Sequence, residues 1–436
     1  MLKKNLMKKV YLSQFIKSFP WIFLAIWMAF NLSVCDFRGF FHKINCIGSF
    51  FGAASFIFFS TSLLLITRWR KLEDWLGGLD KIFRYHQFLG KVGFACLLMH
   101  VFTFALKWAP KGLSSFFLYV FPVHHRLSIN LGSYAFLSMT LILTITIFKL
   151  LPYHIWKKIH QWMSVVFLIS FLHFFLSRKT LGSGLSTAIL YFSALIGFVS
   201  AIYKQLFFSF FVKPFEYTVV KAEVMGETLT KVTLRAKDRI ISFVPGQYAF
   251  IHFEEPNFSK EQHPFTLARN GQYNDLLIYV KNRGDYTKAL QGSLRPNWTA
   301  FLEGPYGCLD YRLHQKQIWI AGGIGIALFL SWMHSLKSNH GKTIDLFFCC
   351  HKRVDLAVLK EFEVLKQGVS GIRIFTFCSE EGKRLCAAEI IKTCPDYRDR
   401  KIFMCGPKKL TYGVRKQFVA LSVKKNDIEY EDFNFF

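Results

Sequence analysis

The sequence has 436 residues, and its 55 lysines and arginines against 28 aspartates and glutamates give a formal net charge of +27. Hydrophobic residues make up 52% of the chain, and phenylalanine alone occurs 50 times. So large an apolar fraction excludes a disordered chain, and it is atypical of a nucleic-acid-binding protein, whose basic surface requires no such apolar content. A membrane protein is therefore the leading class.

Six apolar stretches in the first 212 residues are each long enough, at roughly 20 residues, to cross a bilayer as a helix. We place them near residues 19–34, 46–67, 84–106, 127–149, 157–177 and 184–208. Their flanks are unequally charged, because 15 lysines and arginines fall on the side of the N-terminus and seven on the opposite side. By the positive-inside rule we expect both termini in the cytoplasm. The first predicted domain is thus a six-helix transmembrane bundle over residues 1–212, surrounded by membrane lipid.

The ten cysteines include no Cys-x-x-Cys pair, which gives little support to an iron–sulfur or zinc site. Cys35 and Cys46 fall near the outer loop between the first two apolar stretches. A disulfide between them is compatible with that position, and the sequence leaves the pairing open.

Four histidines lie inside two of the apolar stretches. His86 and His100 are 14 residues apart in the third stretch, and His160 and His173 are 13 residues apart in the fifth. At 1.5 Å per residue each pair spans about 20 Å, and the two stretches run parallel because both are odd-numbered. His86 is therefore level with His160, and His100 with His173. Because imidazole is a suitable axial ligand for haem iron, the sequence predicts two b-type haems, one at each level.

Two other interpretations of these histidines stay open. Each histidine alone is also explained as a hydrogen-bonding group between helices, and the four together as the ladder of a proton channel. The haem hypothesis makes a geometric demand as well. Thirteen steps of about 100° leave His160 and His173 roughly 140° apart around a straight helix, so the fifth stretch needs tighter winding or differently tilted haems.

The pattern of the sequence changes after Pro214. Short alternating runs such as FEYTVVKAEV, TLTKVTLRA and DLLIYVKN, separated by glycine-containing turns, are typical of antiparallel strands. From about residue 315 the pattern changes again, to buried strands that each run into a helix, as in a parallel α/β domain. We therefore predict an antiparallel β domain over residues 213–313 and an α/β domain over residues 314–436.

Two motifs of the β domain indicate its ligand. In HPFTLA, residues 263–268, Pro264 fixes the backbone while Phe265 and Thr266 present a ring and a hydroxyl; in KNRGDYT, residues 281–287, glycine lets the backbone approach an anion beside a lysine. Together they resemble the flavin-binding half of the ferredoxin–NADP reductase superfamily, in the variant found in NADPH oxidases and ferric reductases. The resemblance implies a β-barrel that binds FAD. It implies flavin contacts from His263, Pro264, Phe265 and Thr266, and diphosphate contacts from Lys281, Gly284 and Thr287.

The α/β domain carries the matching nucleotide motifs. IAGGIGIALF follows a strand and opens a helix, so Gly322, Gly323 and Gly325 can bring backbone amides to a diphosphate, although close strand–helix packing requires the same glycines. The segment resembles the nicotinamide-nucleotide loop of that superfamily, and MCGP resembles its partner. By that resemblance Cys405 lies beside the reactive nicotinamide carbon, with Gly406 and Pro407 shaping the turn.

Three further residues are assigned by the same resemblance. Ser379 and Arg384 are the expected contacts to an adenosine 2′-phosphate, which favours NADPH, with NADH as the alternative. The C-terminal Phe436 is the expected aromatic cover of the flavin ring, and Phe433 is its rival. The catalytic residues of the family would then be Thr266, Cys405 and Phe436 of this chain.

The resemblance extends over nearly the whole chain, and it implies a minimal oxidoreductase of a bacterial inner membrane. Electrons are expected to pass from NAD(P)H to FAD, to the haem between His86 and His160, and then to the haem between His100 and His173. The expected acceptor on the far side is oxygen, reduced to superoxide; a ferric chelate or a periplasmic protein is the alternative. Oxygen-reducing relatives carry a histidine four residues after the outer ligand, where this sequence has Phe104. No nucleic-acid partner and no accessory protein are expected.

Overall fold

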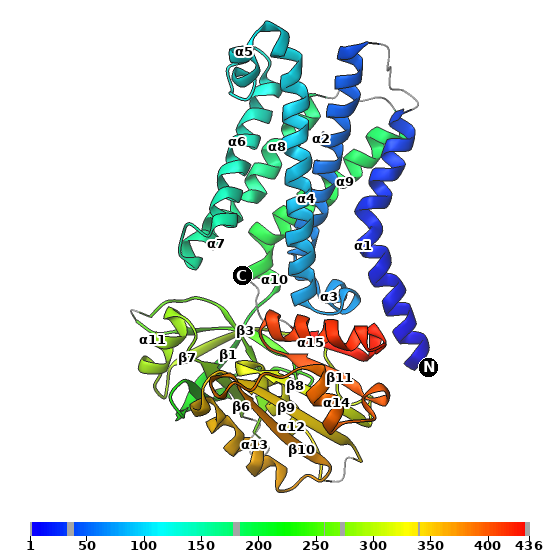
Figure 1. The fold of residues 1–436 in the computed structure, drawn as a ribbon. Coiled ribbons are helices and arrows are strands. Elements are labelled where there is room, and N and C mark those ends of the chain that lie inside the picture. Colours follow the sequence, from blue (N-terminus) through cyan, green and yellow to red (C-terminus); the bar gives the residue numbers. More distant parts are fainter. Residues whose placement is uncertain are drawn as a thin grey trace. The chain divides into compact units, whose positions relative to one another are not determined.

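The computed structural model describes residues 2–32, 39–177, 184–256, 258–270, 275–338 and 341–431, with the side chains of all of these except residues 2–12, 31 and 32 (Figure 1). The chain divides into two compact units, Met1–Phe211 and Val212–Phe436. Each unit is described by itself.

The described part of the N-terminal unit contains helices and their connecting turns, and no strand. Six of the helical stretches described there are long and apolar enough to cross a membrane, which confirms the six predicted spans. The first helix begins well before the predicted span, because the lysine-rich N-terminal segment continues it. The helices are α1 (Leu2–Leu32), α2 (Phe40–Leu65), α3 (Arg70–Leu76), α4 (Leu79–Ala105), η1 (Leu106–Lys111), α5 (Leu113–Leu118), α6 (Leu127–Phe148), α7 (Tyr153–Gln161), α8 (Met163–Leu176), α9 (Leu185–Ile202), η3 (Tyr203–Phe207) and α10 (Phe208–Phe211).

Helix α2 forms the centre of this unit, because α4 and α9 both pack against it. Its buried face is rich in small residues such as Ala53 and Ala54, which let neighbouring backbones approach closely. Buried hydroxyls on the same helix bond to carbonyls one turn earlier, as Ser60 Oγ does to Phe56 O at 2.8 Å. Cys46, also on α2, is disulfide-bonded, while Cys35 lies outside the described residues.

The C-terminal unit begins with a seven-stranded antiparallel sheet. Its strands pair in the order β4-β3-β7-β1-β2-β6-β5. The two ends of this order, β4 and β5, are joined in the chain through Leu267 alone, so the sheet closes on itself as a barrel. The strands are β1 (Phe215–Met225), β2 (Leu229–Ala236), β3 (Tyr248–Glu254), β4 (His263–Thr266), β5 (Ala268–Arg269), β6 (Leu276–Lys281) and β7 (Thr299–Tyr306), and α11 (Asp285–Ser293) follows β6.

A five-stranded parallel sheet completes this unit, in the order β10-β9-β8-β11-β12. Its strands are β8 (Lys316–Gly322), β9 (Thr343–Cys350), β10 (Ile372–Cys378), β11 (Lys401–Cys405) and β12 (Ile428–Glu431). The accompanying helices are η4 (Gly323–Gly325), α12 (Ile326–Met333), η5 (Arg353–Val358), α13 (Leu359–Lys366), η6 (Ser379–Glu381), α14 (Ala387–Thr393), η7 (Tyr397–Asp399), α15 (Lys408–Ala420) and η8 (Lys425–Asp427). The bundle, the barrel and the α/β sheet confirm the predicted fold class.

The strand order locates the ligand edge of the parallel sheet. Strands β8, β9 and β10 follow one another outward, and the chain then crosses back to place β11 on the other side of β8. In parallel α/β sheets, ligands bind at the carboxyl ends of the strands where the order reverses in this way. That point is the end of β8 at Gly322 and the end of β11 at Cys405.

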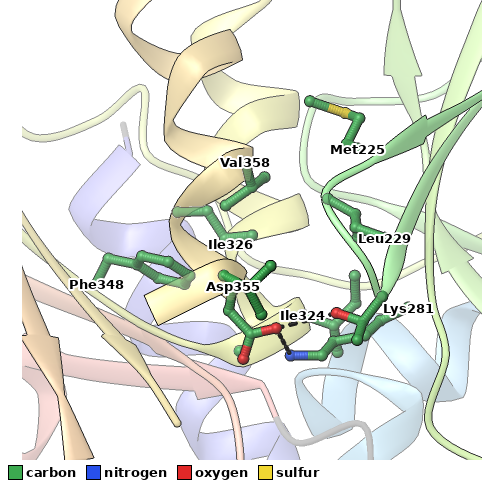
Figure 2. Close-up of a pocket in the computed structure, with 11 residues that line it drawn as sticks. Met225, Leu229, Lys281, Ile324, Ile326, Phe348, Asp355 and Val358 are labelled. Carbon is green, nitrogen blue, oxygen red and sulfur yellow. Dashed lines mark hydrogen bonds and ion pairs between the residues drawn. The ribbon is translucent and has the colours of Figure 1, made fainter. Parts of the chain in front are cut away.

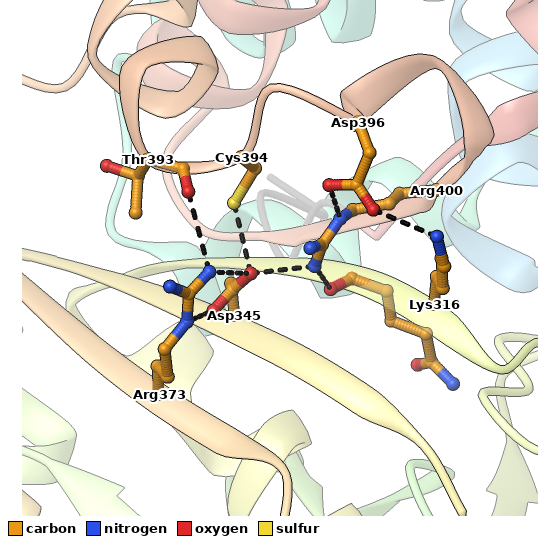
Figure 3. Close-up of polar contacts among 8 residues, drawn as sticks. Lys316, Asp345, Arg373, Thr393, Cys394, Asp396 and Arg400 are labelled. Atoms are coloured by element: carbon orange, nitrogen blue, oxygen red, sulfur yellow. Dashed lines mark hydrogen bonds and ion pairs between the residues drawn. The ribbon is translucent and has the colours of Figure 1, made fainter.

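The opposite edge of the sheet is closed by a buried ionic cluster around Asp345 (Figure 3). Its carboxylate accepts from Arg400 Nη1 at 2.7 Å, from Arg373 Nε at 2.6 Å and from Cys394 Sγ at 3.0 Å. Burial alone would raise the pKa of Asp345, but hydrogen bonds from Arg373 and Cys394 and the charge of Arg400 lower it. The cluster therefore joins β9, β10 and the loop before β11 at the edge remote from the ligand.

Candidate functional site

The two histidine pairs predicted from the sequence lie side by side in the N-terminal unit. The rings of His86 and His160 have their centroids 6.2 Å apart, and those of His100 and His173 are 6.4 Å apart. An imidazole nitrogen binds a first-row metal ion at about 2 Å and the ring centre lies about 1 Å further out, so two axial imidazoles on one iron hold their ring centres about 6 Å apart. Both pairs have the spacing that a bis-imidazole haem requires.

Each of the four imidazoles is held through Nδ1, which leaves Nε2 for a metal ion. His100 Nδ1 lies 2.8 Å from Gly48 O, and His173 Nδ1 lies 2.6 Å from Ser128 O. His86 Nδ1 lies 2.7 Å from Ser62 Oγ and 3.1 Å from the carbonyl of the same residue. His160 Nδ1 lies 3.3 Å from the hydroxyl of Thr146, which also accepts the indole N–H of Trp156. Such partners on the second nitrogen orient metal-binding histidines and fix their tautomer.

The fifth span is interrupted between its two histidines, which meets the geometric demand noted above. Helix α7 ends at Gln161 and α8 begins at Met163, so that Trp162 joins them. The backbone winds tightly there, because Trp162 N bonds to Ile159 O at 3.0 Å and Val165 N to Trp162 O at 2.9 Å, both across three residues. Fewer residues per turn reduce the angle between His160 and His173 around the helix.

Glycines next to the outer pair leave room for the imidazole rings. A Cβ added at Gly52 would lie 2.6 Å from His100 Nδ1, and one added at Gly132 would lie 2.8 Å from His173 Cε1. Four residues after His86, Gly90 faces open space, since a Cβ there would meet nothing within 4 Å. The ring spacing, the Nδ1 partners and the glycines together fit the predicted haems.

In the C-terminal unit, the predicted flavin residues His263, Pro264, Phe265 and Thr266 form strand β4. The ring of His263 stacks on Tyr286, with centroids 4.2 Å apart, and its Nε2 lies 3.1 Å from Glu261 Oε2. Thr266 lies opposite Tyr248 in the ladder and is buried. Sequence reasoning missed Tyr286; its position between Gly284 and Thr287 in the diphosphate motif was the available signal.

The predicted diphosphate residues occupy the end of β6 and the start of α11. The Thr287 hydroxyl accepts the amides of Arg283 at 3.0 Å and Gly284 at 3.1 Å, which caps the helix. Lys281 Nζ lies 2.9 Å from Asp355 Oδ1, an ion pair that the sequence did not predict. The lysine also lies next to the nucleotide loop, because a Cβ at Gly323 would be 3.9 Å from its Nζ.

The nucleotide loop and the MCGP segment meet at the ligand edge of the parallel sheet. A Cβ at Gly325 would lie 2.1 Å from Cys405 O, and one at Gly322 would lie 2.6 Å from Pro407 Cδ. Gly406 has a φ of 157°, and a Cβ added there would lie 2.8 Å from Gly322 Cα. Two of the three loop glycines are thus required by close backbone packing. Gly323, at a φ of 54°, meets only the distant Lys281 and is the one open to a ligand.

The remaining predicted contacts are less completely assembled. Ser379 follows β10, and its hydroxyl lies 3.0 Å from His351 Nδ1, at the same edge of the sheet. Arg384 is exposed, while acidic Glu381 nearby pairs with Arg353 at 3.8 Å and with Lys383 at 3.2 Å. Phe436 and its rival Phe433 lie outside the described residues.

Comparison with known proteins follows the same division of the chain. The model of the ferric reductase like transmembrane component matches residues 51–171, the FAD-binding domain matches residues 214–310, and the oxidoreductase NAD-binding domain matches residues 319–416. His86, His100 and His160 fall inside the first match, and His173 lies just beyond its end. The flavin and nucleotide motifs fall inside the other two matches.

Curated relatives share modest identity with the chain. A flavohemoprotein of Oceanobacillus iheyensis is 22% identical over 50% of this chain and 58% of its own length. Ferric reduction oxidase 4 of Arabidopsis thaliana is 23% identical over 82% of this chain and 50% of its own. NADPH oxidase 3 of Rattus norvegicus is 30% identical over 27% of this chain and 23% of its own. The chain thus spans less than two thirds of each of these relatives. The chain thus combines a ferric-reductase-like transmembrane domain with an FAD-binding and an NAD-binding oxidoreductase domain, and it is similar to ferric reduction oxidases and to an NADPH oxidase.

Proposed function

We propose that this chain transfers electrons from NAD(P)H across a membrane to oxygen on the far side, with FAD and two b-type haems as its cofactors. When bound, FAD accepts a hydride from the nicotinamide and the haems carry single electrons through the bilayer. The observation that carries the proposal is the pairing of four histidines at haem spacing in a chain that also contains FAD- and NAD-binding domains.

In this proposal the N-terminal unit holds the iron atoms and fixes their ligands. His86 and His160 bind one haem, and His100 and His173 bind the other, each through Nε2. The Nδ1 partners, which are carbonyls and hydroxyls of neighbouring helices, hold each ring in place and raise its basicity as a ligand. Tight positioning of this kind keeps the ligands unchanged while the charge on the iron changes.

The C-terminal unit positions the flavin and the nucleotide. Strand β4 supplies the flavin contacts, with Thr266 at the reactive ring and the His263–Tyr286 stack behind it. The edge formed by Gly322, Gly323, Gly325, Cys405, Gly406 and Pro407 receives the nicotinamide half, with Cys405 beside the carbon that loses hydride. Lys281, Gly284 and Thr287 contact a diphosphate, Ser379 and Arg384 contact the 2′-phosphate of NADPH, and Phe436 covers the flavin. We place the chain in a bacterial inner membrane, and the excess of basic residues on the N-terminal side supports an orientation with both termini in the cytoplasm.

The environment of the outer histidine favours a second candidate, reduction of a ferric chelate. The ring of Phe104 lies 5.0 Å from that of His100, and a Cβ at Gly48 would lie 2.6 Å from the same phenylalanine. The space beside the outer ligand is therefore filled by an apolar ring rather than by a polar group for oxygen. Lys107 Nζ lies 4.3 Å from the centre of this ring, where its charge suits an anionic chelate.

Cofactor content tests the core of the proposal. The purified protein should contain two haems by pyridine haemochrome analysis and one FAD, and anaerobic NADPH should reduce both. At most one haem per fully loaded chain would contradict the two-level arrangement. A protein without a Soret band or flavin absorbance would instead favour a proton channel built from the histidines.

The acceptor is tested with the protein in sealed vesicles, supplied with NADPH on the side of the C-terminal unit. Oxygen as acceptor predicts a superoxide signal on the opposite side that superoxide dismutase removes. Faster reduction of ferric citrate than of oxygen, lost in Lys107→Glu, would favour the ferric chelate instead.

A further inference from the structure

Lys281 lies between a carboxylate that binds it and a backbone turn that is open to a ligand. On one side, Nζ forms an ion pair of 2.9 Å with Asp355 Oδ1. On the other side it is 3.9 Å from the Cβ position of Gly323, the first residue of the nucleotide turn. The turn is open to a ligand there, so a diphosphate that reaches the amides of the turn comes within reach of the same ammonium group.

The ion pair has little contact with water, which strengthens the attraction between its two charges. The side chains of Lys281 and Asp355 are 22% and 10% exposed. Figure 2 shows them joined in an ion pair at the wall of a small cavity, with Met225, Leu229, Ile326 and Val358 as apolar neighbours. The Thr228 hydroxyl donates to the same Asp355 oxygen at 3.0 Å. Burial alone would raise the pKa of Asp355, but Lys281 and Thr228 lower it, so this carboxylate stays charged.

The cavity that the two residues help to line is too small to admit a diphosphate. Its volume is about 20 Å³, which is room for little more than one water molecule. A diphosphate that engages Lys281 must therefore bind outside the cavity, and the lysine must turn away from Asp355 to meet it. With the carboxylate in place, the diphosphate also approaches a like charge.

We propose that Lys281 exchanges Asp355 for the diphosphate of a bound dinucleotide, so that Asp355 is a built-in competitor that weakens dinucleotide binding. This inference rests on the proposed function, because it takes a dinucleotide as the ligand. The exchange breaks one ion pair and forms another without any covalent step. It also loosens the contact between η5, which carries Asp355, and strand β6, which carries Lys281, so that ligand binding and the fit of the two sheets are linked.

A second carboxylate on the same segment supplies a matched control. Glu361, on α13, accepts from Lys231 Nζ at 2.8 Å and from Tyr279 O–H at 2.6 Å, and so also joins the parallel sheet to the barrel. It does not contact Lys281. Its removal loosens the same junction without releasing the ammonium group near Gly323.

The test compares dinucleotide affinity in the full-length protein by isothermal titration calorimetry. Asp355→Asn, which keeps a partner for the Thr228 hydroxyl, should tighten binding of NADP⁺ to the FAD-loaded protein, or of FAD to the flavin-depleted protein, about fivefold or more. The arm that responds identifies which diphosphate Lys281 receives. Glu361→Gln should not tighten either. In a Lys281→Met background Asp355→Asn should have no effect on affinity. In the wild-type background, the increase in affinity caused by Asp355→Asn should become smaller as the salt concentration is raised.

A purely structural ion pair predicts the opposite sign. If Asp355 positions Lys281 for the ligand, Asp355→Asn will weaken binding, and unchanged or weaker binding in both arms overturns the inference. If the Asp355→Asn variant melts at a lower temperature than wild type, Asp355→Ser serves as the second variant in the same binding measurements. If the wild-type protein binds neither dinucleotide, the proposed function fails as well, whereas equal binding by wild type and variant refutes only the exchange.

Discussion

Among the described residues of the N-terminal unit, the buried polar side chains are mostly neutral hydroxyls, with Glu73 and Asp80 as the charged exceptions, whereas several buried charges of the C-terminal unit pair with other charges. His100 bonds to Gly48 O and Ser60 to Phe56 O, while Asp345 lies between two arginines. The surfaces differ in the same sense, because many phenylalanines and leucines of the long helices are exposed, as expected where lipid is the solvent. A neutral group satisfied by a carbonyl costs little in lipid, while a buried charge requires a counter-charge. Cofactor ligands of the two units should therefore fail independently.

The largest expected effect is the loss of a whole cofactor from one unit only. His100→Ala removes one of the two ligands of the outer pair, so haem content should fall from two to one per chain. FAD content should stay at one, since the flavin residues lie in the separately packed C-terminal unit. Pyridine haemochrome analysis and released flavin fluorescence measure both. Loss of flavin together with haem would break the comparison.

The second effect concerns the buried charge of the C-terminal unit. Arg400 is 6% exposed and Asp345 is fully buried, so Arg400→Leu should destabilise this unit by about 3–5 kcal/mol. Arg373, which is 55% exposed, is the control, and Arg373→Leu should cost clearly less. Thermal melts followed by flavin release should shift, while the Soret band should persist to the wild-type temperature. Equal shifts for the two arginines would refute this account.

A third prediction concerns the pH dependence of stability in the C-terminal unit. Burial alone would raise the pKa of Glu361, but hydrogen bonds from His334, Lys231 and Tyr279 lower it from 4.5 to about 2. A lowered carboxylate pKa contributes stability that is present above pH 4.5 and lost as the pH falls toward 2, here about 3 kcal/mol. Glu361→Gln should therefore be less stable than wild type at pH 7 and converge with it near pH 2. A constant difference across this range would contradict the assignment.

The smallest expected effect is local. Thr287→Ala removes the hydroxyl that accepts the amides of Arg283 and Gly284, and loss of such a helix cap costs about 1 kcal/mol. Hydrogen exchange should accelerate in the first turn of α11 and stay unchanged in α4. Thr287→Ser, which keeps the hydroxyl, should restore slow exchange. Faster exchange in both variants would show that the methyl group, not the cap, matters.

The six spans, the matched positions of the four histidines along their helices and the change from antiparallel strands to an α/β pattern followed from the sequence alone. These features depend on neighbours along the chain: an apolar run of fixed length, the 1.5 Å rise of a helix and the alternation of a strand. The resemblance of the motifs to a known superfamily likewise implied flavin and nucleotide domains.

Tertiary structure decided which side chains meet, because those contacts join residues far apart in the chain. Lys281 and Asp355 are 74 residues apart, and Gly325 packs on Cys405 from another strand end. The tight turn at Trp162 and the stack of Tyr286 on His263 are likewise set by packing rather than by local preference. Local rules fix where a residue lies along its element, while its partner is chosen by how the elements pack, since burial of charge and ring area is a property of the assembled unit.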